Sequence, residues 1–162
     1  MLHHHHAVPI ALAVSISLFT SYGYAQGAGP FARMAGSWSG AGSLTMTNGA
    51  QERLRCRARY NVGGGGNELR LSLRCASESY NFDLGGNVET NGNTITGSWN
   101  EATRNVAGSV TGRVDRDRVQ VVARSDTFSA SLSLVTQGNR QSVAIRPQGT
   151  EVSAVSIMLS KS

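Results

Sequence analysis

Two arginine-rich arms, each carrying one cysteine, constrain the fold more than any other part of the sequence. Over residues 51–76, apolar and polar side chains alternate with period two, which is typical of β-strands. Folding the arms at Gly63–Gly66 places Cys56 opposite Cys75, and the same register matches apolar with apolar side chains throughout. Because a slip of one residue would undo both matches, we predict a hairpin closed by a Cys56–Cys75 disulfide.

The rest of the chain repeats this pattern between turn sequences such as Asn48-Gly49 and Pro147-Gln148-Gly149. If Gly85-Gly86 bends one strand rather than ending it, ten strand-like runs follow one another with short connections. Closing ten such strands removes the exposed sheet edges. We therefore predict an all-β, up-and-down antiparallel barrel over residues 36–162, with a two-sheet β-sandwich as the alternative.

A second hairpin is predicted over residues 94–114. Setting Glu101 against Arg104 places Trp99 opposite Val106, with the glycines of both strands beside the tryptophan ring. Glu101 and Arg104 then share one rim. A rim ion pair is the favoured interpretation, because acid–base catalysis needs a second positioned titrating group and none is evident.

The first 25 residues are typical of a secretory signal peptide. An apolar run over Ala7–Phe19 is too short for a good membrane span, and Gly23-Tyr24-Ala25 offers the small residues that a signal peptidase prefers. Residues 26–35 would follow as a flexible lead-in. We therefore predict a periplasmic or secreted protein, since an exported chain can keep a disulfide.

Cleavage after Ala25 would remove all four histidines, His3–His6, whether they are a tag or native. With its two cysteines bonded to each other, the remaining chain has no histidine- or cysteine-based metal site and no histidine-dependent triad. No phosphate-binding loop is present either, because Gly63–Gly66 joins two strands. We predict no catalytic residue, no metal, no cofactor and no enzymatic activity.

Gly36-Ser37-Trp38, at the start of the first strand, resembles the Gly-X-Trp opening of the lipocalins and the wider calycin group. That resemblance implies that Trp38 plugs one end of the barrel against a basic side chain of the last strand, here Lys161. Residues 34–159 also resemble a family of uncharacterised bacterial secreted proteins, which share Arg-Cys in both arms of a hairpin. A protein-interaction role, as in periplasmic protease inhibitors with small disulfide-bonded barrels, is the second functional interpretation.

Six aromatic side chains have inward parity and are candidates for lining a pocket for a small apolar or amphipathic ligand. A filled core is the alternative interpretation. The six are Trp38, Tyr60, Tyr80, Phe82, Trp99 and Phe128.

Six arginines share the outward face of the cysteine hairpin, and we call this set the arginine ladder. It predicts an anionic partner, since arginine binds phosphate or carboxylate in a bidentate manner. The alternative is a solvated face that interleaves with Glu52, Glu68 and Glu78. Nucleic acid is not predicted, because stacking aromatics are absent from this face. An outer-membrane barrel is not favoured either. Either the arginine-bearing face would have to meet lipid or the arginines would have to lie inside the barrel, and the few aromatic side chains do not gather at the strand ends. The ladder comprises Arg53, Arg55, Arg57, Arg59, Arg70 and Arg74.

Overall fold

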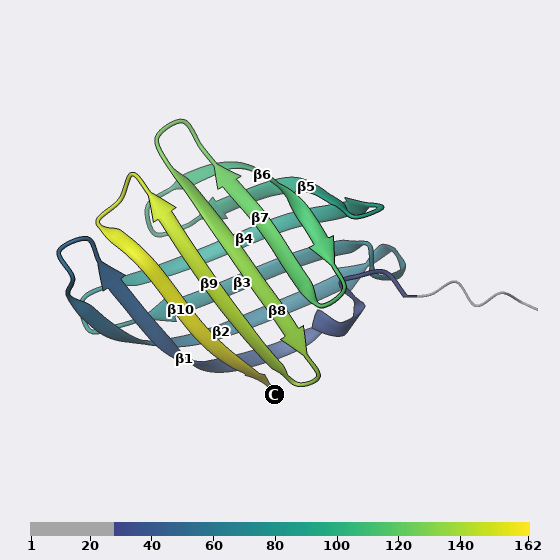
Figure 1. Cartoon of the computed structure of the whole chain (residues 1–162), viewed down its shortest axis with the longest axis horizontal. Helices are drawn as coiled ribbons and strands as arrows, with labels where there is room; N and C mark the ends of the chain where they lie inside the picture. Colours follow the sequence, from purple (N-terminus) through teal and green to yellow (C-terminus); the bar gives the residue numbers. More distant parts are fainter. Residues whose placement is uncertain (1–27) are drawn as a thin grey trace, which may run out of the picture.

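In the computed structural model, which describes residues 28–162, the chain forms a closed barrel of ten antiparallel strands (Figure 1). Each strand pairs with its neighbours in sequence, and β1 pairs with β10 to close the barrel. The predicted barrel is therefore confirmed, and the sandwich alternative is wrong. The predicted signal peptide lies outside the described residues. The strands are β1 (Gly36–Met46), β2 (Gln51–Gly63), β3 (Glu68–Ala76), β4 (Asn81–Asn91), β5 (Thr94–Glu101), β6 (Val106–Asp115), β7 (Arg118–Arg124), β8 (Ser129–Gln137), β9 (Arg140–Gln148) and β10 (Val152–Lys161).

The cysteine hairpin, β2–β3, has the predicted register. Cys56 lies directly opposite Cys75, the two Cα atoms are 4.2 Å apart, and the disulfide is formed. Both cysteines are buried among the inward-facing apolar side chains. The next strand, β4, runs without a break through Gly85-Gly86, which is why the count is ten.

The hairpin β5–β6 differs from its predicted register by two residues. Trp99 lies opposite Gly108, and Glu101 lies opposite Val106. The cause is a longer loop: the Glu101 carboxylate accepts the backbone N–H of Arg104 at 2.8 Å, and Asn105 takes a positive φ of 53°. A shift of two residues keeps the inward parity of every side chain, so the core pattern survives.

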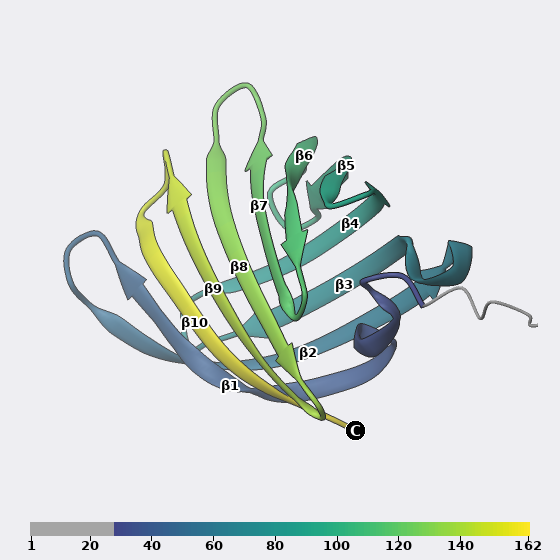
Figure 2. The ribbon, with the colours of Figure 1, turned by 45° about the vertical axis from the view of Figure 1, so that its right-hand side comes forward.

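One end of the barrel, which we call the closed end, is sealed by the N-terminal segment (Figure 2). Phe31 precedes the short 3₁₀ turn η1 (Ala32–Met34) and is fully buried, and the indole Nε1 of Trp38 donates to the Met34 carbonyl at 2.8 Å. Lys161 Nζ lies 5.5 Å from the centroid of the Trp38 ring, as the calycin resemblance implies. The lead-in predicted to be flexible is thus packed over residues 28–35, because Phe31 buries its ring there.

The Gly63–Gly66 loop, which includes the turn η2 (Gly64–Gly66), holds this segment in place. The N–H of Phe31 donates to the Gly66 carbonyl at 3.0 Å, and the N–H of Gly29 donates to Gly65 at 2.7 Å. Gly66 has a φ of 99°, and a Cβ there would overlap the backbone of Gly29. The glycines therefore serve two purposes, since they turn the chain and let a second backbone approach closely.

A buried polar chain lies inside the closed end. The Tyr60 hydroxyl donates to Gln141 Oε1 at 2.6 Å, and Gln141 Nε2 donates to Thr136 Oγ1 at 3.0 Å. The Tyr60 ring packs edge-on against Trp38, with centroids 6.4 Å apart. Burial raises the pKa of Tyr60, against a smaller opposing effect of its hydrogen bond to Gln141. Tyr60 is therefore a neutral structural residue of a filled core.

Candidate functional site

The barrel is hollow at its other end, which we call the open end. There the chain turns through residues 47–50, 77–80, 102–105, 125–128 and 149–151. The cavity has a volume of about 310 Å³, near the lower limit of about 300 Å³ for small-molecule sites. Its wall comprises Tyr80, Phe82, Leu84, Trp99, Glu101, Arg104, Val106, Ala123, Thr127, Phe128, Ala130, Leu132, Ile145, Pro147, Gly149, Thr150, Val152 and Val155.

Small side chains on neighbouring strands leave this space. Ala123 on β7 lies directly opposite Ala130 on β8, and both are buried in the cavity wall. Phe82, Leu84 and Leu132 also line the cavity, yet they remain only half-buried. A close-packed core would cover such side chains on all sides. Part of their surface therefore faces the cavity.

Trp99 forms one wall of the cavity and is held in place from two sides. Its indole Nε1 donates to the Arg124 carbonyl at 3.2 Å, and its ring lies 5.4 Å from the ring of Phe128. Gly108 lies opposite, where a Cβ would overlap the Arg124 carbonyl and come within 3.0 Å of the indole nitrogen. The glycine thus makes room for both the indole and the carbonyl that accepts its hydrogen bond, and the expected placement of a glycine beside Trp99 is met although the facing residue differs.

Arg104 and Tyr80 form a polar rim at the cavity entrance. The guanidinium carbon of Arg104 lies 4.2 Å from the centroid of the Tyr80 ring, within the range of a cation–π contact. Arg104 Nη1 donates to the Asn81 carbonyl at 3.0 Å and lies 3.5 Å from Glu101 Oε2. The predicted Glu101–Arg104 rim ion pair is therefore present. Burial raises the pKa of Tyr80, while the positive charge of Arg104 partly opposes that shift.

Glu101 is fixed by the loop that follows it. Burial works against its ionisation, but hydrogen bonds from the Thr103 hydroxyl and from the backbone N–H groups of Asp83, Arg104 and Thr103 outweigh it. The pKa of Glu101 is consequently lowered from its ordinary value of 4.5. Glu101 is therefore ionised near neutral pH, and its oxygens accept hydrogen bonds from Thr103 and Arg104 of the loop.

The structure separates the six predicted ligand-lining aromatics into two groups. Tyr80, Phe82, Trp99 and Phe128 line the cavity. Trp38 and Tyr60 do not, because they belong to the filled core of the closed end. Whether the four contact a ligand stays a prediction. Sequence reasoning missed the small residues Ala123 and Ala130, although their shared inward parity on neighbouring strands was the available signal.

The arginine ladder lies on the outer wall, as its parity predicted. Arg53, Arg55, Arg57 and Arg59 are exposed on β2. On the neighbouring β3, Arg70 Nε donates to Asn87 at 3.0 Å and Arg74 Nε pairs with Asp83 at 2.9 Å.

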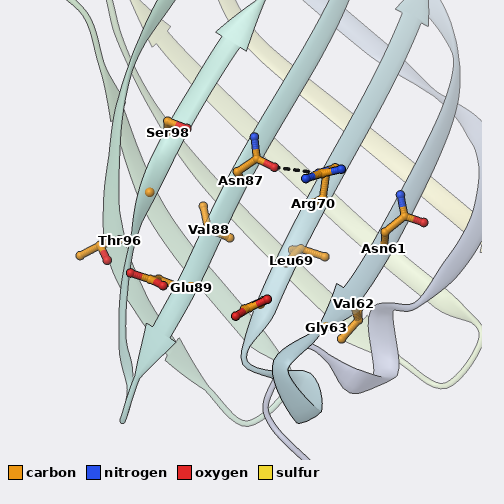
Figure 3. Close-up of a pocket in the computed structure, with 12 residues that line it drawn as sticks. Asn61, Val62, Gly63, Leu69, Arg70, Asn87, Val88, Glu89, Thr96 and Ser98 are labelled. Atoms are coloured by element: carbon orange, nitrogen blue, oxygen red, sulfur yellow. Dashed lines mark hydrogen bonds between the residues drawn. The ribbon is translucent and has the colours of Figure 1, made fainter.

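A polar groove of about 610 Å³ also lies on the outside of β2–β5, and it differs in kind from the cavity (Figure 3). Figure 3 shows Asn61, Arg70 and Asn87 on this surface, with the Arg70–Asn87 hydrogen bond across it. These outward side chains are polar and do not enclose a ligand, so this groove is a poorer small-molecule site than the cavity.

Over residues 28–162, no group of three or more His, Cys, Asp or Glu side chains is placed to hold a metal ion. The same range contains no helix that is long and apolar enough to cross a membrane.

Two solved structures share the fold. Rv2717c from M. tuberculosis aligns with a TM-score of 0.66 and 12% identity, over 81% of this chain and 94% of its own. The S-type phycobiliprotein lyase CPES from Guillardia theta aligns with a TM-score of 0.56 and 13% identity, over 82% and 90%. The sequence matches no protein-family model and no curated protein. At these identities the likeness concerns the fold, so the calycin-like barrel is supported, while membership of a bacterial secreted family stays a prediction.

One prediction is corrected by this comparison. The chain was expected not to be an enzyme, because its sequence shows no nucleophile with a base and no paired acid and base. CPES, which has the same barrel fold, is named a lyase. The lack of a recognisable catalytic motif therefore does not exclude an enzymatic activity for a barrel of this kind.

Proposed function

We propose that the protein binds a small apolar or amphipathic molecule inside the open end of its barrel. The observation that carries this proposal is the apolar cavity of about 310 Å³, set beside a closed end whose core is filled. An interior that is packed at one end and hollow at the other is typical of a pre-formed ligand site.

The rim favours an amphipathic ligand. Arg104, ion-paired with Glu101, supplies polar donors and a positive charge at the entrance, and the hydroxyls of Thr127 and Thr150 lie in the same wall. A ligand with an apolar body and a polar or acidic head would place its body against Phe82 and Leu132 and its head at this rim. We further propose that the protein is exported, which is compatible with its disulfide.

Tryptophan fluorescence tests the proposal, because the two indoles lie at opposite ends of the barrel. Trp38→Phe leaves Trp99 in the cavity wall as the reporter, and Trp99→Phe leaves Trp38 in the closed end as the matched control. We expect 1-anilinonaphthalene-8-sulfonate and saturated fatty acids of graded length to change the emission of Trp99 and not that of Trp38.

A blocking variant completes the experiment. Ala123→Phe should fill the cavity and abolish the Trp99 response, whereas Ala107→Phe places the same ring on the exposed face of β6 and should leave it unchanged. Native mass spectrometry of the purified protein would show whether a molecule is retained. Equal responses of the two tryptophans, or no response to any probe, would contradict the proposal and favour the interaction-module interpretation.

A further inference from the structure

Independently of the cavity, we propose that the arginine ladder binds a linear acidic polysaccharide along the outer wall of the barrel. Arg53, Arg55, Arg57 and Arg59 occupy every second position of β2, so neighbouring side chains leave the strand about 6.6–6.8 Å apart. Within residues 28–162, no carboxylate forms an ion pair with any of these four. A row of regularly spaced, uncompensated charges matches a polymer with repeated anionic groups.

The neighbouring acidic residues do not neutralise the row. Arg57 lies directly opposite Arg74, and only Arg74 is paired, through Asp83. Glu52, one of the acids expected to interleave with the arginines, instead accepts hydrogen bonds from the hydroxyls of Ser77 and Ser79. Those hydroxyl contacts, with Ser77 first, lower the pKa of Glu52. Like charges that face each other across strands are unfavourable, and an anionic ligand would relieve that repulsion.

The wall beside the arginines is shaped to admit a chain. A groove of about 1150 Å³ runs between β1 at Ser39 and Ala41, β2 from Arg53 to Arg57, and the start of β4 at Asn81 and Asp83. Its β1 side has only small side chains, so a polymer can lie against the strand without steric hindrance. Hydroxyl and amide groups at Ser39 and Asn81 offer the hydrogen bonds that a polyhydroxylated chain requires.

The composition of this face selects among anionic partners. Single-stranded nucleic acid is bound by stacking aromatic side chains, and β1–β3 carry none on their outer face. Firm membrane binding combines large apolar side chains with basic ones, whereas exposed basic side chains alone give only weak attraction to anionic lipid. Among the described residues Met158, which is 57% exposed, is the one exposed large apolar side chain; it lies opposite Ala41 of the groove, and a single such side chain is a small apolar surface. Charge combined with hydroxyl and amide groups therefore favours a sulfated or carboxylated polysaccharide, to which arginine binds in a bidentate manner.

Retention on immobilised heparin tests the inference, with alginate as a carboxylate-only competitor. The variant Arg53→Ser/Arg55→Ser/Arg57→Ser removes three charges from the ladder. Its matched control, Arg113→Ser/Arg118→Ser/Arg146→Ser, removes three exposed arginines from β6, β7 and β9. We expect the ladder variant to bind heparin about tenfold more weakly, because each lost exposed charge contact changes affinity about twofold. The control should bind nearly as well as the unaltered protein.

Folding and partner class are checked in the same series. Far-ultraviolet circular dichroism should be unchanged in both triple variants, because all six arginines are exposed. Replacing the three ladder arginines by lysine keeps the charge and should give an intermediate affinity. If the ladder and control variants lost heparin affinity equally, the effect would be one of net charge and the proposal would be overturned. The proposal would also be overturned if the unaltered protein were not retained on heparin at 0.1 M salt. Tighter, ladder-dependent binding to oligothymidylate or to vesicles with anionic lipid would overturn the polysaccharide assignment.

Discussion

The cavity at the open end predicts that one substitution will have opposite effects at the two ends of the barrel. Ala130 lines the cavity, whereas Ala58 lies in the filled core between Trp38 and Leu73. Both alanines are about equally buried, at 4% and 5% exposure. Replacing each by leucine therefore tests whether space is available at one end and absent at the other.

The magnitudes follow from what the larger side chain contacts. At Ala130, leucine adds three carbon atoms at about 0.8 kcal/mol each, less about 0.5–1 kcal/mol of side-chain entropy. We expect Ala130→Leu to raise the free energy of unfolding by about 1–2 kcal/mol. At Ala58 the same atoms have no space, so overpacking should lower it by about 1–3 kcal/mol.

Urea unfolding of the oxidised protein measures both changes. An altered midpoint with an unchanged m value would identify a change in stability rather than in the denatured state. Ala130→Leu should also weaken binding of 1-anilinonaphthalene-8-sulfonate, since it occupies the same volume. If Ala130→Leu destabilises the protein as much as Ala58→Leu does, the open end is packed and the reasoning is refuted.

Three further predictions concern stability. Tyr60→Phe leaves the buried Gln141 oxygen without its donor and should cost about 1–3 kcal/mol in urea unfolding, whereas a cost below about 0.5 kcal/mol would show that another donor replaces it. The Glu101 pKa is lowered from 4.5 on folding, so the stability from its carboxylate is present above that pH and is lost as the pH falls through the folded pKa. Glu101→Gln should therefore flatten the acid side of the stability profile, and an unchanged profile would contradict this role. Joint replacement of Cys56 and Cys75 by serine should cost about 3 kcal/mol, given their separation of 19 residues, and loss of the barrel's circular dichroism signal is not expected.

The two hairpins show why parity is easier to predict than register. In β2–β3 the alternation and the Cys56–Cys75 pair both require one register, so the prediction was right. In β5–β6 no cross-strand pair links the two arms in the sequence, and a two-residue shift keeps the same side chains inward. The hydrogen bond from the Arg104 backbone to Glu101 decided between these registers, and it depends on loop geometry rather than on periodicity.

The candidate site was predicted in part for a similar reason. Inward parity identified Phe82, Trp99 and Phe128, but it assigned the same status to Trp38 and Tyr60. Periodicity reports which face a side chain takes and carries no information about its height along the barrel axis. Only the closed structure shows that Phe31 seals the level of Trp38, while the level of Phe128 stays hollow.

By itself, the sequence determined the all-β class, the inward and outward faces of the strands, the disulfide and the exposed row of arginines. These properties follow from a period of two residues, which local chain geometry imposes on every strand. The tertiary structure decided where the interior is filled and where it is empty. That outcome depends on which side chains from distant strands meet at one level, such as Gln141 beside Tyr60 and Ala130 opposite Ala123. Packing between distant strands is set by closure of the barrel, and no short stretch of sequence contains it.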